Sequence, residues 1–446
     1  MKELSVRPYE TAYNYTVRYY PRWFTWVQSR LNTENSPTGQ SIINRLAGPL
    51  GMGPEYKIVV AINDDTVYTQ AFLEISGGPM ILTIPPYPNH YSVLQLDVFG
   101  AVISTSLTQS PPQDGGSFGF CLAGQESSLP AGVTPVVLPY GSTELILRID
   151  KYSQGQNVIT EANSFRASLL LRTVEQFEAG TTGLHGGGTF IAPLFNYAPS
   201  VKMMADVGVL EAPEAFLETL REAMDSPTTQ PITEADATLI GEFNALFDDA
   251  RRDPDSPLMS HIIQGARAAH AALVNRWQSR RGATNWVHCD NIGHWGDAYL
   301  DRAALTEYIQ YGNDLAAAFY ANAFVDGSGV PLDGASFAYT LTFTPETLPQ
   351  YQRFWSLTAY TPGPIELVPN SLNKYVVASY TPGLVTDESG NITVIIQADE
   401  PSDGQTANWL PVPKGPFSLL FRVYGPEGAA RDGSYLTPKL HRVTPR

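Results

Sequence analysis

Apolar residues recur every three or four positions between residues 8 and 46, which is the spacing of one face of an α-helix. The stripe consists of Tyr9, Tyr13, Val17, Tyr20, Phe24 and Val27. Pro21 lies inside it, and because proline removes a helical hydrogen bond, the pattern predicts two short helices rather than one. Their apolar faces are expected to pack on a larger body of the protein.

A different pattern begins near residue 57, where short runs of β-branched and aromatic residues are separated by Pro, Gly and Asn. Runs of this length at this spacing predict the strands of a sandwich or barrel. The strands expected in this first β region cover residues 56–60, 66–69, 80–84, 91–96, 102–107, 133–138 and 144–148.

Helical spacing returns further along the chain, and a proline lies near the start of each predicted helix. These helices cover residues 214–225, 235–251 and 258–281. A second set of strands is then predicted at residues 339–343, 354–359, 375–378, 392–397 and 417–423.

The patterns together predict an α+β fold that is mainly β, with two β-sandwich or jelly-roll-like domains, N-terminal helices and a central helical segment. With 446 residues, the chain is long enough for two or three domains and for large cores without disulfide or metal staples. The expected divisions are an N-terminal helical segment at 1–50, a first β-sandwich at 51–205, a helical connection at 206–290 and a C-terminal β-sandwich at 291–446.

Composition and charge narrow the classes of function. The chain has 44 acidic and 28 basic residues, a net charge of −16, and no run of Lys or Arg, which argues against binding nucleic acid or anionic membranes. It contains no stretch of about 18 mainly apolar residues. Two cysteines and an N-terminus without a secretory signal predict a cytoplasmic protein. The sequence leaves open whether the protein forms a homo-oligomer.

Two groups of residues could be interpreted as a nucleophile and as a metal site, but the residues around them do not favour either. Gly115 to Gly119 matches the nucleophile elbow around Ser117, but prolines precede it where the elbow needs a strand, so a hairpin loop is favoured. His288, Cys289, Asp290 and His294 lie within seven residues, yet their spacing matches no standard metal site. The glycines fit no phosphate-binding loop, and therefore we expect neither a metal nor a cofactor.

Two segments concentrate polar side chains beside apolar strands. Residues 63–68 place two acids, an amide and a hydroxyl before a strand, although turn formation alone explains Asn-Asp. Asp97 ends an apolar run, where a carboxylate is costly unless it is paired or functional. Residues 354–360 alternate, so Trp355, Leu357 and Ala359 share one strand face and Ser356, Thr358 and Tyr360 the other. The proline-rich loop 408–417 fixes Trp409 and Lys414, and is equally consistent with a rigid structural turn.

The first of these segments resembles the core of the domain-of-unknown-function family numbered 1254, through Asn63, Asp65, Thr66 and Tyr68 and the strand that ends at Asp97. Residues 293–442 resemble the family numbered 1214. The matching stretches are 296–303, 331–334, 354–358, Asn370 with Tyr375, 408–411 and 413–417. The resemblance implies two β-sandwich or jelly-roll-like domains with a helical connection. It also implies a role in natural-product pathways, in which fungal relatives can take part.

Without a nucleophile triad, metal cluster or nucleotide loop, the sequence favours a cofactor-independent enzyme for an apolar small molecule. The expected activity is that of a pericyclase-like cyclase or isomerase of natural-product biosynthesis, which needs a shaped aromatic pocket and hydrogen-bond donors. The candidate catalytic residues are Asp65, Tyr68, Asp97 and Lys414, and the candidate substrate-binding residues are Asn63, Thr66, Trp355, Tyr360, Asn370 and Trp409. Two alternatives stay open: a hydrolase or lyase with an Asp65–Asp97 acid/base pair, and a non-catalytic glycan- or ligand-binding protein.

Overall fold

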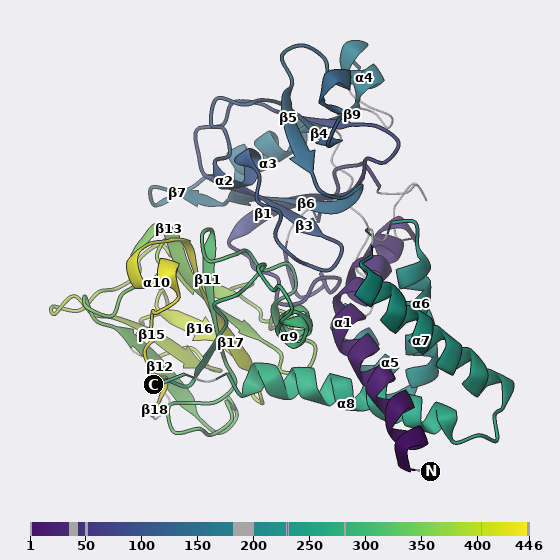
Figure 1. Cartoon of the computed structure of the whole chain (residues 1–446). Helices are drawn as coiled ribbons and strands as arrows, with labels where there is room; N and C mark the ends of the chain where they lie inside the picture. The colour runs from purple at the N-terminus through teal and green to yellow at the C-terminus, as the bar shows by residue number, and fades with distance from the viewer. Residues whose placement is uncertain are drawn as a thin grey trace.

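The computed structural model describes residues 2–34, 43–49, 52–181, 200–228, 230, 232–280, 282–402 and 404–443. Two β domains lie side by side, and a bundle of helices flanks them (Figure 1). The predicted fold class, α+β with mainly β domains, is confirmed.

The first β domain consists of two sheets that share one apolar core. One sheet has the order β1 (Thr66–Glu74), β6 (Ser142–Asp150), β3 (Tyr91–Asp97). The other has the order β5 (Thr134–Leu138), β4 (Gly116–Leu122), β2 (Met80–Ile84), β9 (Leu170–Thr173). The accessory elements are α2 (Ser106–Gln109), a 3-10 turn (Glu126–Ser128), β7 (Tyr152–Ser153), β8 (Gln156–Asn157), α3 (Ile159–Ser168) and α4 (Val174–Glu178).

The second β domain repeats this two-sheet arrangement around its own core. Its larger sheet has the order β10 (Trp286–His288), β11 (Ala318–Ala323), β17 (Ser418–Pro426), β13 (Tyr351–Tyr360), β14 (Val376–Ala378). Its smaller sheet has the order β16 (Trp409–Pro411), β15 (Ile392–Gln397), β12 (Ala338–Phe343), β18 (His441–Val443), and the short α10 (Gly428–Asp432) follows β17.

A third core joins the helices to both β domains. The helices are α1 (Lys2–Glu34), α5 (Val201–Glu211), α6 (Pro213–Asp225), α7 (Glu234–Arg252), α8 (Leu258–Gln278) and α9 (Tyr299–Ile309). Helix α8 reaches from the bundle to the second β domain, and α9 lies where the bundle and the β domains meet (Figure 1). Among the described residues, no helix combines the length and apolarity needed to cross a bilayer.

Three predictions of helices or strands were wrong. The N-terminal helix does not break at Pro21 but continues through it, because the surrounding turns bury Tyr20, Trp23 and Phe24 in the helical core. Residues 56–60 form no strand although Tyr56, Ile58 and Val60 are buried, since burial alone does not supply a strand neighbour. Residues 102–107 form only an isolated bridge and the start of α2, which Thr105 caps.

Candidate functional site

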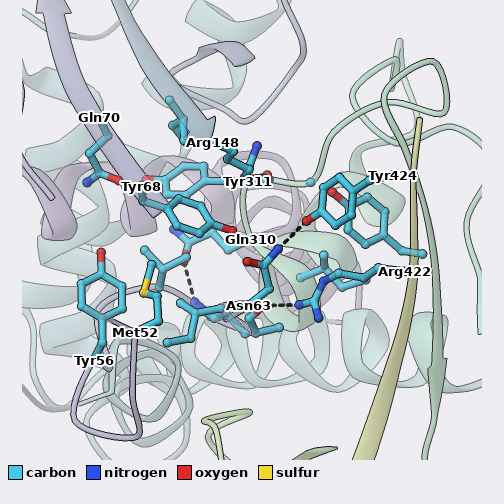
Figure 2. A pocket seen from close by; sticks show the side chains of 18 residues that line it. Met52, Tyr56, Asn63, Tyr68, Gln70, Arg148, Gln310, Tyr311, Arg422 and Tyr424 are labelled. Atoms are coloured by element: carbon cyan, nitrogen blue, oxygen red, sulfur yellow. Dashed lines mark hydrogen bonds between the residues drawn. The ribbon is translucent and has the colours of Figure 1, made fainter. Parts of the chain in front are cut away.

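A cavity lies between the two β domains, next to the C-terminal end of α9 (Figure 2). Its walls come from the segment before β1, from β1 and β6, from the turn after α9, and from β11 and β17. About 470 Å³ of it is not filled by protein atoms, part of this open to solvent, and the space open to the centre of a water molecule is about 40 Å³. The polar side chains in its walls include Asn63, Tyr68, Arg148, Gln310, Arg422 and Tyr424.

Asn63 shapes one wall and reaches across to the other domain. Its Oδ1 accepts hydrogen bonds from Asp65 N at 3.3 Å and Thr66 Oγ1 at 3.2 Å, which is how a short amide side chain closes a turn. Its Nδ2 donates to the Tyr424 hydroxyl on β17 at 2.5 Å (Figure 2). The side chain that forms the turn therefore also binds this turn to the second β domain.

Asp65 lies behind this wall and is fully buried. Its carboxylate accepts hydrogen bonds from the Ser356 hydroxyl at 2.8 Å and from the Tyr380 hydroxyl. Burial raises the pKa of Asp65, and the positive charge of Arg422 and these two hydrogen bonds oppose the shift. With both carboxylate oxygens engaged, Asp65 is suited to positioning the turn rather than to exchanging a proton with a ligand.

Arg422 holds the same turn from β17. It donates to the Ala61 carbonyl at 2.6 Å, to the Thr358 hydroxyl at 3.2 Å and to the Tyr360 hydroxyl at 2.7 Å. Tyr360 in turn donates to the Ile62 carbonyl. The polar face predicted for residues 354–360 thus contacts the turn, and Thr66 and Tyr360 belong to the structural support of the site.

Arg148 and several phenols form the opposite wall. Arg148 donates to Asn313 Oδ1 at 3.1 Å and to the Tyr311 carbonyl at 2.8 Å, and its guanidinium lies 5.4 Å from the centre of the Tyr68 ring. Burial and the neighbouring phenols of Tyr320 and Tyr68 raise the pKa of Tyr424 well above its usual value. Protonated phenols beside a guanidinium can donate hydrogen bonds to an oxygen on which negative charge develops.

No carboxylate is found among the described residues that line the cavity. Glu144 follows the same face of β6 as Arg148, because residues two apart on a strand point to the same side. Burial raises the pKa of Glu144 to about 8, with Tyr311 and Arg148 opposing the shift. Glu144 is therefore mostly neutral at pH 7, and the cavity has an excess of positive charge.

The structure does not bring Asp65 and Asp97 together. Asp65 precedes the β1 residue that pairs with Asp150, whereas Asp97 pairs with Thr143 at the other end of β6. At about 3.3 Å per residue along a strand, this register separates them by about 20 Å or more. The Asp97 carboxylate accepts from the backbone N–H groups of Phe99 at 2.9 Å and Ala101 at 2.8 Å, so it closes the loop after β3.

The remaining sequence candidates lie away from the cavity. Lys414 is exposed and pairs with Asp399 on the surface, and Asn370 caps its own loop through Val368 and Lys374. Trp355 is fully buried in the core of the second β domain. Trp409 donates through its indole N–H to the Gln397 carbonyl at 2.8 Å.

Substitutions of Asp97 and Lys414 are expected to differ in their effect on the free energy of unfolding. Asp97→Ala leaves two backbone N–H groups without their acceptor and is expected to lower the free energy of unfolding by about 1–3 kcal/mol. Lys414→Gln removes only an exposed ion pair, and is expected to change stability by less than about 0.5 kcal/mol. Urea unfolding of the two variants checks both values. Equal losses in the two would contradict this assignment.

The two motifs set aside on sequence grounds have structural roles. Ser117 is in β4, where its hydroxyl lies 3.1 Å from that of Thr83 on the paired strand, so the segment is neither a nucleophile elbow nor the expected hairpin loop. His288 bonds to the Tyr320 carbonyl through Nδ1 at 2.9 Å, whereas His294 lies near Asp314. In the described part of the chain these residues form no cluster of metal-ligating atoms.

One cluster of metal-capable side chains was missed in the sequence, because its members are far apart along the chain. Asp206, His270 and Glu307 have ligand atoms within 4.8 Å of one another. Lys202 already neutralises this cluster, since its Nζ lies 2.8 Å from Asp206 and also contacts Glu307. Burial raises the pKa of Glu307 to about 7, with Lys202 opposing the shift.

The fold is that of an α+β protein with two β domains, and residues of both domains line the cavity between them. The profile of the family described as protein of unknown function DUF1254 matches residues 43–173, and that of DUF1214 matches residues 317–428. The chain therefore belongs to the proteins that combine these two domains. No curated protein matches the sequence.

Two solved structures are similar to the chain. The crystal structure of the VPA0106 protein from Vibrio parahaemolyticus has a TM-score of 0.60 and 20% sequence identity, over 99% of this chain and 100% of that one. The crystal structure of a putative uncharacterized protein from Burkholderia cenocepacia has a TM-score of 0.46 and 14% identity, over 96% of this chain and 88% of that one. The first similarity supports the fold alone.

Proposed function

We propose that the protein is a cofactor-independent enzyme that binds a small molecule in the cavity between its β domains and acts as an isomerase or cyclase. The observation that carries this proposal is the convergence of phenol, guanidinium and amide groups on one cavity from separate parts of both domains. Such fixed donors stabilise negative charge that develops on a substrate oxygen, as in a polarised carbonyl or an enolate. The cytoplasmic location and the natural-product pathway expected from the sequence stay predictions.

The structure changes which residues are expected to act. Tyr68 and Arg148 face the cavity and are the groups expected to contact the substrate, whereas Asn63 fixes the wall. The cavity wall is held in place by hydrogen bonds of Asp65, Thr66, Tyr360 and Arg422. The hydrolase alternative loses its main support, because the two aspartates are at opposite ends of β6.

A second candidate is a binding protein without chemistry. It is favoured by Asp65, because hydrogen bonds from Ser356 and Tyr380 engage both oxygens of this carboxylate behind the cavity wall. In this case the cavity would hold a ligand and release it unchanged.

The two functions differ in the fate of the ligand. Purified protein is incubated with a small-molecule extract, and mass spectrometry with chromatography detects compounds that are replaced by isomers of equal mass. Tyr68→Phe is expected to lower the conversion rate on the order of 100-fold, because it removes one hydrogen-bond donor from the reacting oxygen. Tyr152→Phe is the matched control, since Tyr152 stacks on Tyr380 outside the cavity. Compounds that bind and are recovered unchanged would contradict the enzyme and support the binding protein.

A further inference from the structure

Arg148 is a buried cation without an ionised partner at hydrogen-bonding distance. It lies on β6, the central strand of one sheet of the first β domain, it lines the cavity, and the residue is 5% exposed. The two hydrogen bonds that its terminal nitrogens donate go to neutral oxygens, and its Nε–H has no partner among the described residues. A guanidinium has five N–H groups, so donors remain available. Burying a charge in this way is costly unless an opposite charge completes the site.

The other arginines near the cavity are compensated. Arg353 pairs with the Asp150 carboxylate, with Nε 3.0 Å from Oδ2, and Arg422 lies close enough to Asp65 to oppose the rise in that carboxyl's pKa. Arg172 and Arg302 also have an Nε–H without a partner in the described chain, but neither lines this cavity. Arg148 therefore combines an uncompensated charge with access to a ligand.

The groups around Arg148 favour an anion as that ligand. The phenol rings of Tyr68, Tyr311 and Tyr320 contribute to the cavity walls, and protonated phenols donate hydrogen bonds. The Tyr320 oxygen accepts from Asn313 N at 3.1 Å and Nδ2 at 2.7 Å, which leaves its own hydroxyl proton for another acceptor. Two described carboxyls share the strand face of Arg148: Glu144, which burial keeps mostly neutral at pH 7, and Asp150, which pairs with Arg353.

We propose that Arg148 anchors a carboxylate, so that the ligand of this cavity is a small carboxylic acid. This inference rests on the proposed function only in assigning that acid as the substrate. A carboxylate fits because two adjacent N–H groups of a guanidinium match its two oxygens. The paired N–H groups of a guanidinium also match phosphate oxygens, so inorganic phosphate is the competing ligand.

The test compares benzoate with benzamide, its neutral analogue of the same shape, by isothermal titration calorimetry at pH 7. Benzoate is expected to bind the wild-type protein at least about tenfold more tightly, which is the effect of one added charge-assisted contact. Arg148→Gln is expected to remove this preference, and Arg148→Lys to reduce it, because lysine keeps the charge without the paired donors. Arg172→Gln is the matched control, since it removes another largely buried arginine outside the cavity and is expected to leave the preference unchanged.

Other binding results overturn the proposal. Equal binding of benzoate and benzamide, or no binding of either at 10 mM (about 100-fold above a modest Kd of ~0.1 mM), shows that Arg148 anchors no carboxylate. Inorganic phosphate that binds more tightly than benzoate and depends on Arg148 shows a phosphate site instead. If Arg148→Gln does not fold by circular dichroism, Arg148→Lys decides, and an unchanged preference there counts against the anchor. A carboxylate that binds but is never converted leaves the anchor intact and contradicts the enzyme.

Discussion

Replacing Arg422 by glutamine is expected to lower the free energy of unfolding by about 3–5 kcal/mol, which is typical for removing one partner of a buried charge network. Arg422 is 2% exposed and connects β17 to the turn before β1 through the Ala61 carbonyl. Its loss leaves the buried Asp65 carboxylate without the positive charge that opposes its desolvation. Urea unfolding measures the loss, and the exposed Lys414→Gln is the control with an expected change below about 0.5 kcal/mol.

A double-mutant cycle with Asp65→Asn tests whether the two residues act together. In the Asp65→Asn background, Arg422→Gln is expected to cost at least about 1 kcal/mol less than in the wild type, because no charged group is then left uncompensated. Additive effects, within about 0.5 kcal/mol, would mean that Arg422 and Asp65 stabilise the protein independently. The network that connects the cavity wall to the second domain would then be misassigned.

Replacing Glu144 by glutamine is expected to stabilise the protein at pH 8 to 9 and to have little of this effect at pH 5. The carboxyl has a pKa of about 8 in the folded protein, above the value of 4.5 expected when it is exposed. Between these values the folded state holds a proton that the unfolded state has released. Stability therefore falls as pH rises through this window, by an amount on the order of 4–5 kcal/mol.

Glutamine does not titrate, so Glu144→Gln is expected to remove this pH dependence. The groups that act on Glu144 are the phenol of Tyr311 and the guanidinium of Arg148, and the phenol of Tyr56 also senses its charge. None of these groups changes charge between pH 5 and 8, and other titrating groups such as Glu307 cancel in the comparison. The difference in urea unfolding free energy between variant and wild type is measured at pH 5, 6.5 and 8. A difference independent of pH would contradict the assigned pKa of Glu144.

The elements of this fold follow largely from local patterns in the sequence. The strand alternation at 354–360 is confirmed in detail, since Trp355 and Leu357 enter the second core while Ser356 and Tyr360 contact the turn before β1. The helix through Pro21 was not predictable in this way, because packing against the other helices outweighs the hydrogen bond that proline removes.

Only some residues of the candidate site could be predicted from the sequence. Asn63 and Tyr68 were selected because polar residues stood before a strand, and both line the cavity. Arg148 and Arg422 were missed, although each interrupts an apolar strand with a charge, as Asp97 does. Applying the same physical argument to them would have selected both. That they line one cavity from two domains depends on how the two sandwiches pack, which no local pattern encodes.

The claim that the two β domains share one ligand site is tested most directly by a crystal structure of the protein with 4-bromobenzoate, in which anomalous scattering locates the bromine. We expect one bromine site in the cavity between β6 and β17, with the carboxylate on Arg148. A bromine site elsewhere, for example in the hollow lined by Lys151, Lys374 and Tyr380, or an empty cavity at saturating ligand, would contradict it.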